Sequence, residues 1–243
     1  MLYKLKNKYI ENMVTLKKIG DRYKLSCSYL VLNKMFEYSR NNENRGKVND
    51  AKLTNNIVRA RSTVLELAMC NPWEYFVTLT LNQKKYDRYN LDKYIKDLGQ
   101  FIRDQRKKYK SDIKYLLIPE QHKDGAWHMH GFLHGLTSDM LQKNERGYMD
   151  WVDYCKKFGN CSIGKIEYKD RASIYITKYV TKDYTKSVTK LNAKMYYCSR
   201  GLQRAEKIKE GLLNGQLSNP DWIGDYAAIK WFNNLDAALK YID

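Results

Sequence analysis

The chain has 243 residues, enough for one sizeable hydrophobic core and a smaller appended unit. Its 44 lysines and arginines outnumber 27 acidic residues, and the formal net charge of +17 favours a polyanionic partner, usually nucleic acid. No apolar run approaches the roughly 18 residues needed to span a bilayer, and the five scattered cysteines, without a Cys-x-x-Cys pair, argue against a disulfide framework and against a cysteine zinc site.

Residues 1–71 are predicted to form a basic, mainly helical N-terminal region. Apolar residues recur there at helical spacing, at Ile57, Ala60, Val64, Leu65 and Ala68. The dipeptide Asn71-Pro72 is expected to end this helix, because the residue before a proline disfavours helical backbone.

Residues 72–190 carry the clearest pattern of elements. The β-rich run 75–81 predicts a buried strand, and Asn90 is placed to cap a helix. The apolar face of that helix consists of Leu91, Tyr94, Ile95, Leu98, Phe101 and Ile102. A second strand is expected at 115–118, and the Asp124-Gly125 turn joins it to a third strand.

The second half of this region predicts a helix over 138–158, a fourth strand over 163–168 and a helix that carries two tyrosines. The order β-α-β-β-α-β indicates an α+β, ferredoxin-like antiparallel sheet with helices on one face and the active site on the open face. Residues 191–243 are expected to form a C-terminal helical extension, with a helix over 222–241.

The third strand contains His128 and His130, separated by one apolar residue. In a strand, residues i and i+2 project from the same face, so both imidazoles can approach one cation. Glu120 lies across the turn and is expected opposite His128. This mixed nitrogen and oxygen set suits Mn²⁺ or Mg²⁺, and Zn²⁺ is chemically possible. His122 and His134 are alternative ligands, and ordinary exposed strand residues are the alternative interpretation.

The second chemical feature is the run Tyr175-Ile-Thr-Lys178-Tyr179-Val-Thr-Lys182, two overlapping Tyr-x-x-Lys units. On a helix, Tyr175, Tyr179 and Lys182 fall on one narrow arc flanked by Lys178 and Lys186. A nearby ammonium stabilises a phenolate, which makes a tyrosine a better nucleophile. The alternative interpretation is an amphipathic helix with tyrosines at the core rim and solvated lysines.

Three motifs in this order resemble the HUH endonucleases, specifically the rolling-circle replication initiators of phages and plasmids. Residues 76–80 look like their first motif, Glu120 with His128-Met129-His130 like their metal motif, and residues 175–182 like their nucleophile motif. The resemblance covers roughly residues 72–190. It implies a divalent metal at Glu120, His128 and His130, and catalysis by Tyr179 and Tyr175 with Lys178 and Lys182.

The resemblance also implies that the protein nicks one strand of origin DNA, holds the 5′-phosphate on tyrosine and later rejoins the strand. The expected partner is single-stranded DNA at a replication origin, with a host helicase and polymerase, because the sequence has no P-loop motif of its own. We expect a cytoplasmic protein with no signal peptide and no membrane partner. Alternatives are a relaxase or single-tyrosine transposase of the same chemistry, or a non-catalytic basic nucleic-acid-binding module.

Overall fold

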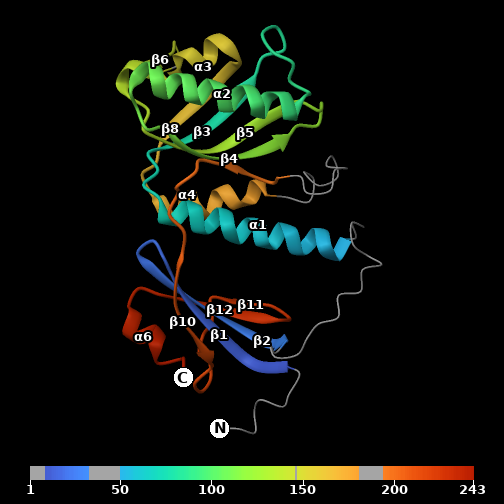
Figure 1. Ribbon diagram of the computed structural model, residues 1–243, viewed down its shortest axis with the longest axis vertical. Coiled ribbons are helices and arrows are strands. Elements are labelled where there is room, and N and C mark those ends of the chain that lie inside the picture. The colour runs from blue at the N-terminus through green and yellow to red at the C-terminus, as the bar shows by residue number, and fades with distance from the viewer. Residues whose placement is uncertain (1–8, 33–49, 146, 181–193) are drawn as a thin grey trace. The chain divides into compact units, whose positions relative to one another are not determined.

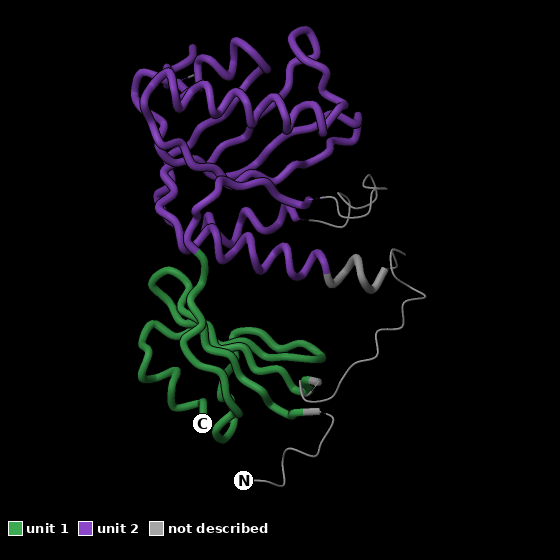
Figure 2. The backbone as a smooth tube through the Cα atoms, viewed as in Figure 1, with its two compact units in different colours: residues 1–47, 204–243 green, residues 48–203 purple. Residues whose placement is uncertain are grey.

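The structure is a computed structural model that describes residues 9–32, 50–145, 147–180 and 194–243. The chain divides into two compact units (Figure 2): residues 48–203 form one, and residues 1–47 with 204–243 form the other. These units do not follow the predicted boundaries after residues 71 and 190, because strands near the two ends of the chain pair with each other.

The larger unit is built on a seven-stranded antiparallel sheet of order β6-β7-β8-β3-β5-β4-β9. Its central strands are β8 (Gly159–Lys165), β3 (Tyr75–Leu81), β5 (Trp127–His134) and β4 (Lys114–Gln121). With the helices between them, these strands give the β-α-β-β-α-β order of a ferredoxin-like fold. The α+β class predicted from the sequence is therefore confirmed.

One face of this sheet is covered by α2 (Leu91–Tyr109), the helix predicted after Asn90. The Asn90 side chain accepts a hydrogen bond from the backbone N–H of Lys93 at 3.0 Å, which satisfies one of the free donors at the start of the helix. The buried residues of this face form one cluster that includes Val77, Leu79, Tyr94, Leu98, Phe101, Ile102, Leu117, Met129 and Leu133.

The opposite face is also covered by helices, so the expectation of helices on one face only is wrong. The helix α1 (Asp50–Cys70) and the segment α4 (Lys169–Ile176) with η4 (Thr177–Tyr179) lie on this second face (Figure 1). They bury a separate apolar cluster that includes Val64, Leu67, Leu116, Ile118, Phe132, Ile176 and Val180. Strand parity explains this, because Phe132 and Leu133 point to opposite faces.

The predicted helix over 138–158 is mostly wrong. The structure has η3 (Ser138–Met140), β6 (Leu141–Lys143) and β7 (Met149–Trp151) there, and only α3 (Val152–Lys157) is α-helical. A turn at Gly147, with φ of 80°, allows β6 and β7 to pair. The fourth strand starts and ends earlier than predicted, because β8 pairs with β3 along its whole length.

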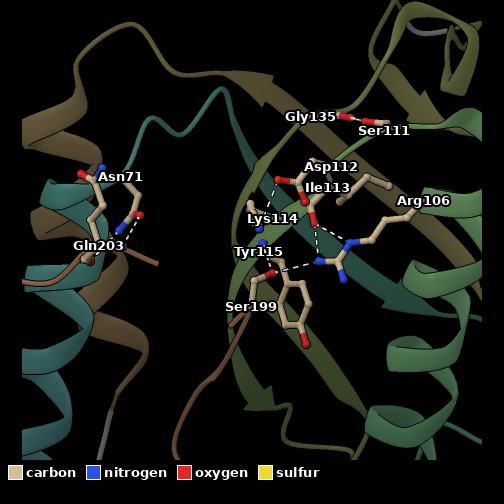
Figure 3. Close-up of polar contacts among 10 residues, drawn as sticks. All are labelled: Asn71, Arg106, Ser111, Asp112, Ile113, Lys114, Tyr115, Gly135, Ser199 and Gln203. Atoms are coloured by element: carbon tan, nitrogen blue, oxygen red, sulfur yellow. Dashed lines mark hydrogen bonds and ion pairs between the residues drawn. The ribbon is translucent and has the colours of Figure 1, made fainter. Parts of the chain in front are cut away.

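The segment that follows the tyrosines returns along β4 as β9 (Tyr197–Cys198). Figure 3 shows its polar anchors: the Ser199 hydroxyl accepts hydrogen bonds from the Tyr115 backbone N–H at 3.0 Å and from Arg106 at 3.2 Å. The Asn71 side chain exchanges two hydrogen bonds with the backbone of Gln203, at 2.8 and 3.0 Å. These contacts fasten the end of this unit to its sheet and to the end of α1.

The smaller unit corrects two helical predictions. Its five-stranded sheet has the order β10-β1-β2-β12-β11. The strands are β1 (Tyr9–Ile19), β2 (Arg22–Leu32), β10 (Glu206–Leu212), β11 (Trp222–Ile223) and β12 (Ala227–Phe232), and α6 (Leu235–Leu239) is its helix. Residues 9–32 and most of 222–241 are thus strands rather than helices.

Alternation accounts for these strands. Val14, Leu16, Leu25 and Cys27 are buried at every second position of the first hairpin, which is the period of a strand packed on one face. Gly20, with φ of 60°, supplies the backbone that the hairpin turn requires. Within the described residues, no helix is long and apolar enough to cross a membrane.

Candidate metal and nucleophile site

The two histidines of β5 lie between the strands β3 and β4. In the register of the sheet, His128 faces Thr80 on β3 and Glu120 on β4, while His130 faces Thr78. The predicted position of Glu120 opposite His128 is therefore correct, and it follows from the Asp124-Gly125 turn. All these side chains project to the face that also holds α4 and η4.

Glu120 and His130 are already in contact. The His130 Nε2 atom lies 2.7 Å from Oε2 of Glu120, and His130 is buried with only 7% of its surface exposed. A carboxylate can only accept, so Nε2 donates in this pair. Burial lowers the pKa of His130, which keeps its imidazole neutral, although Glu120 acts in the opposite direction.

Two threonines orient the two imidazoles. Thr78 Oγ1 lies 3.1 Å from Nδ1 of His130, and Thr80 Oγ1 lies 3.1 Å from Nδ1 of His128. A hydroxyl can donate or accept, so each threonine can support either imidazole tautomer. Partners of this kind hold metal-ligating histidines in position. Both threonines stand in the first motif, but sequence reasoning gave them no role.

His128 packs against His122 from the turn, with ring centroids 3.7 Å apart and planes 6° apart. Burial lowers the pKa of His128 to about 4, and the neighbouring His122 and His130 add to this effect. A neutral imidazole retains the lone pair that a cation requires. His122 therefore supports His128, and its Nε2 lies 3.9 Å from Oε2 of Glu120.

The predicted ligand set fits a divalent cation in its chemistry, and it is partly assembled. The Glu120 carboxylate and the His130 imidazole converge, whereas the ring centroids of His128 and His130 are 6.5 Å apart with nearly parallel planes. A cation would replace the proton that Glu120 and His130 now share. His134 lies 3.4 Å from Glu74, so it has a different carboxylate partner.

The tyrosine segment reaches this same face. The ring of Tyr179 stacks on the imidazole of His130, with centroids 4.0 Å apart and planes 8° apart. The Tyr179 hydroxyl donates to the Tyr175 hydroxyl at 3.2 Å. The Lys178 ammonium lies 3.5 Å from the centroid of the Tyr175 ring and 4.9 Å from that of Tyr179. Both tyrosines and Lys178 are therefore grouped beside the histidines.

The two tyrosines have opposite electrostatic environments. The Lys178 ammonium lowers the pKa of Tyr175, and the hydrogen bond from Tyr179 adds to this effect. Burial raises the pKa of Tyr179, and its hydrogen bond to Tyr175 contributes. Tyr175 is 47% exposed, so water can reach it. Of the two, Tyr175 is the phenol that ionises more easily.

Apolar contacts and one hydrogen bond hold this segment on the sheet. Ile176 and Val180 are buried in the cluster of the second face, as the predicted apolar stripe implies. Arg61 of α1 donates from Nε to the backbone carbonyl of Val180 at 2.8 Å. The predicted catalytic Lys182 and its neighbour Lys186 lie outside the described residues.

Residues 74–184 match a family model of replication-associated proteins, those of the ORF2 type. The match includes all three motifs and covers slightly less than half of the chain. It confirms the predicted likeness to rolling-circle replication initiators, and an HUH core is consistent with that family. No curated protein and no solved structure matches the chain.

Proposed function

We propose, for a chain whose residues 74–184 match a family of replication-associated proteins, that it nicks and rejoins single-stranded DNA at a replication origin through a phosphotyrosine bond. The observation that carries this proposal is the meeting of Glu120, His130 and Tyr179. They come from two strands and a helical segment far apart in the sequence, yet they form one continuous contact. A basic chain with a net charge of +17 suits this substrate.

In the proposed reaction, a tyrosine oxygen attacks the scissile phosphorus. A bond forms between the phenol oxygen and phosphorus, and the bond between phosphorus and the 3′ oxygen breaks. The phenol proton leaves before or during attack, and the 3′ oxygen takes up a proton to become a 3′-hydroxyl. A polymerase can extend this hydroxyl. The phosphodiester character is kept in the phosphotyrosine bond, so rejoining by the reverse attack needs no ATP.

Glu120, His128 and His130 are the residues that would hold Mn²⁺ or Mg²⁺. When bound, such a cation withdraws charge from the scissile phosphate and orients it for in-line attack. Thr78 and Thr80 keep the two imidazoles in place through Nδ1. Glu120 then serves as a ligand rather than as the partner of a protonated His130 nitrogen.

Tyr179 is our first choice as the nucleophile of the nicking step, because it lies directly against His130. Tyr175 is the candidate for the second transfer, because it is hydrogen-bonded to Tyr179 and its pKa is lowered by Lys178. The Lys178 ammonium stabilises negative charge on the phenolate and on the phosphorane. Lys182 is proposed to do the same for Tyr179, by analogy with the spacing of Tyr175 and Lys178.

The decisive experiment uses a 5′- or 3′-labelled single-stranded oligonucleotide that contains the origin of the replicon encoding the chain. The protein is incubated with it in Mn²⁺, and a covalent adduct is sought on a denaturing gel. We expect an adduct that carries the label on the 3′ side of the nick, disappears with chelator and is absent with a scrambled oligonucleotide. Peptide mapping should place it on Tyr179 or Tyr175.

Three outcomes would contradict the proposal. The first is binding without any adduct, which the non-catalytic module predicts. The second is an adduct that survives complete chelation, and the third is an adduct on neither tyrosine. A relaxase or transposase would form the adduct on a transfer origin or a transposon end rather than on the replication origin, so a panel of the three substrates separates these alternatives.

A further inference from the structure

A second group of metal-binding side chains lies away from the histidines. Asp150 of β7, Cys155 of α3 and Cys161 of β8 each offer one donor atom, and these atoms all lie within 4.8 Å of one another. Cys161 pairs with Leu79 in the sheet register, and Leu79 points to the face covered by α2. The group therefore lies on the opposite face from His128 and His130.

The distance between the two sulfur atoms suits a shared ion. Cys155 Sγ and Cys161 Sγ are 3.5 Å apart. Two thiolates that bind Zn²⁺ tetrahedrally, each at about 2.3 Å, are separated by about 3.8 Å. A disulfide requires about 2.05 Å, so the sulfur atoms would have to approach each other by about 1.5 Å. The arrangement is thus close to that of two ligands of one cation.

Neighbouring groups hold the three donors in place. The backbone N–H of Trp151 donates to Cys161 Sγ at 3.0 Å, and such a bond favours a thiolate. Asn144 donates from Nδ2 to Oδ1 of Asp150 at 3.2 Å, which leaves the other carboxylate oxygen for a cation. The chain also brings the Lys85 ammonium to within 2.9 Å of the Cys155 carbonyl oxygen.

The three donors also line a cavity of about 900 Å³. The cavity gives solvent access to the site and leaves room for a fourth ligand, such as water. Softness decides the choice of metal, because thiolates prefer Zn²⁺ over Mn²⁺, Mg²⁺ or Ca²⁺.

We propose that Asp150, Cys155 and Cys161 bind one thiophilic divalent cation, Zn²⁺ among the common ions, with a fourth position open to the cavity. The bound ion joins β7, α3 and β8, so it stabilises the end of the sheet where β7 pairs with β8 at a single position, Met149 with Ile163. This site does not depend on the nuclease chemistry proposed above. Its ligands are soft, whereas those of the histidine site are oxygen and nitrogen.

The test uses the full chain with His128→Ala and His130→Ala, so that the other candidate site cannot contribute. The reduced, metal-free protein is titrated with Co²⁺, which reports thiolate ligands through charge-transfer absorption in the near ultraviolet, and then with Zn²⁺. We expect one equivalent of Co²⁺ to produce this absorption, Zn²⁺ to displace it, and Zn²⁺ to raise the melting temperature. Cys155→Ser and Asp150→Asn should each weaken Co²⁺ binding at least tenfold.

Cys198→Ser is the matched control, because Cys198 lies in β9 outside the group, and it should leave the titration unchanged. Cys155 is half-buried, so Cys155→Ser is expected to fold, and circular dichroism of the metal-free variants checks this. No thiolate absorption in the reduced parent, or equal absorption in Cys155→Ser, overturns the proposal. Rapid loss of two hydrogens from the parent under glutathione disulfide, together with no Co²⁺ signal, assigns the pair to a disulfide instead.

Discussion

The ring of Tyr179 lies parallel to the imidazole of His130, with centroids 4.0 Å apart. This stacking joins the end of a helical segment to a central strand of the sheet, and it places a phenol next to the proposed metal ligands. The contact also gives the two motifs a mutual dependence, because a change in either ring alters the surroundings of the other.

The first prediction concerns the histidines. His128→Ala with His130→Ala should abolish formation of the DNA adduct, because two of the three proposed ligands are lost. DNA affinity should stay within a few-fold, because phosphate contacts elsewhere supply most of it. Gel shift and adduct assays measure the two effects separately. His134→Ala, which alters the same strand but a residue paired with Glu74, should leave both unchanged. Normal adduct yield in the double variant would remove His128 and His130 from the site.

The second prediction separates the two tyrosines. Tyr179→Phe should remove most initial nicking, because the oxygen beside His130 is lost while the stacked ring remains. Tyr175→Phe should spare nicking and impair the joining step, measured with a pre-nicked and a second acceptor strand. Tyr168→Phe is a suitable control, because Tyr168 is exposed and precedes the same helix. Equal nicking by Tyr179→Phe and the parent would assign the first attack to another residue.

The third prediction is a pH dependence. Lys178 lowers the pKa of Tyr175, so Lys178→Met should raise that pKa toward its ordinary value. A smaller fraction of Tyr175 is then ionised at any given pH below the pKa, and the rise of the joining rate with pH moves to higher pH. Joining rates across an alkaline pH series measure this shift. Lys96→Met, at an exposed position of α2, should not move the profile.

The fourth prediction tests a buried pair in the core. The hydroxyls of Tyr94 and Tyr154 are 2.7 Å apart and both residues are fully buried. Tyr94→Phe leaves the Tyr154 hydroxyl with only a long contact to the Thr80 carbonyl, at 3.5 Å, and should lower the free energy of unfolding by about 1–3 kcal/mol. The double variant with Tyr154→Phe should lose less than the sum of the single losses, because no hydroxyl is then left without a partner. Strict additivity in chemical denaturation would show that the two hydroxyls are not coupled.

The fifth prediction concerns the strand that carries the histidines. A Cβ atom at Gly131 would overlap the backbone of Leu116 on β4. Gly131→Ala should therefore separate β5 from β4 and lower the free energy of unfolding by more than about 3 kcal/mol. Gly99→Ala is the matched control, because the nearest atom to its new Cβ is 3.7 Å away in the middle of α2. That change should stabilise the chain by up to about 1 kcal/mol. Similar stability of the two variants would contradict this account of Gly131.

Local signals were enough to predict the hairpin and α2. The Asp124-Gly125 turn fixes the register that sets Glu120 opposite His128, and the spacing from Leu91 to Ile102 defines a helix with Asn90 at its start. These features depend on residues that are close in the sequence. The predicted metal ligands and tyrosines were for this reason placed on the correct elements.

Long-range pairing is what the sequence concealed. Thr78 and Thr80 reach the histidines only because β3 pairs with β5, about 50 residues later in the chain. The helical predictions failed where short strands pair at a distance, as in β1 with β10. The cysteines appeared scattered because Asp150, Cys155 and Cys161 meet only after β7 and β8 come together.

The smaller unit is made from both ends of the chain, with β1 held between β2 and β10. During synthesis, β1 and β2 leave the ribosome long before their partners β10 and β12 exist, whereas residues 48–203 are complete earlier. The first hairpin must therefore wait with two unpaired edges, a state in which strands are prone to pair with other chains. A ribosome stalled after residue 203 would carry a larger unit able to fold, and a hairpin still open to aggregation. Full-length synthesis, rather than folding of the larger unit, thus sets the time at which this protein becomes safe from misassembly.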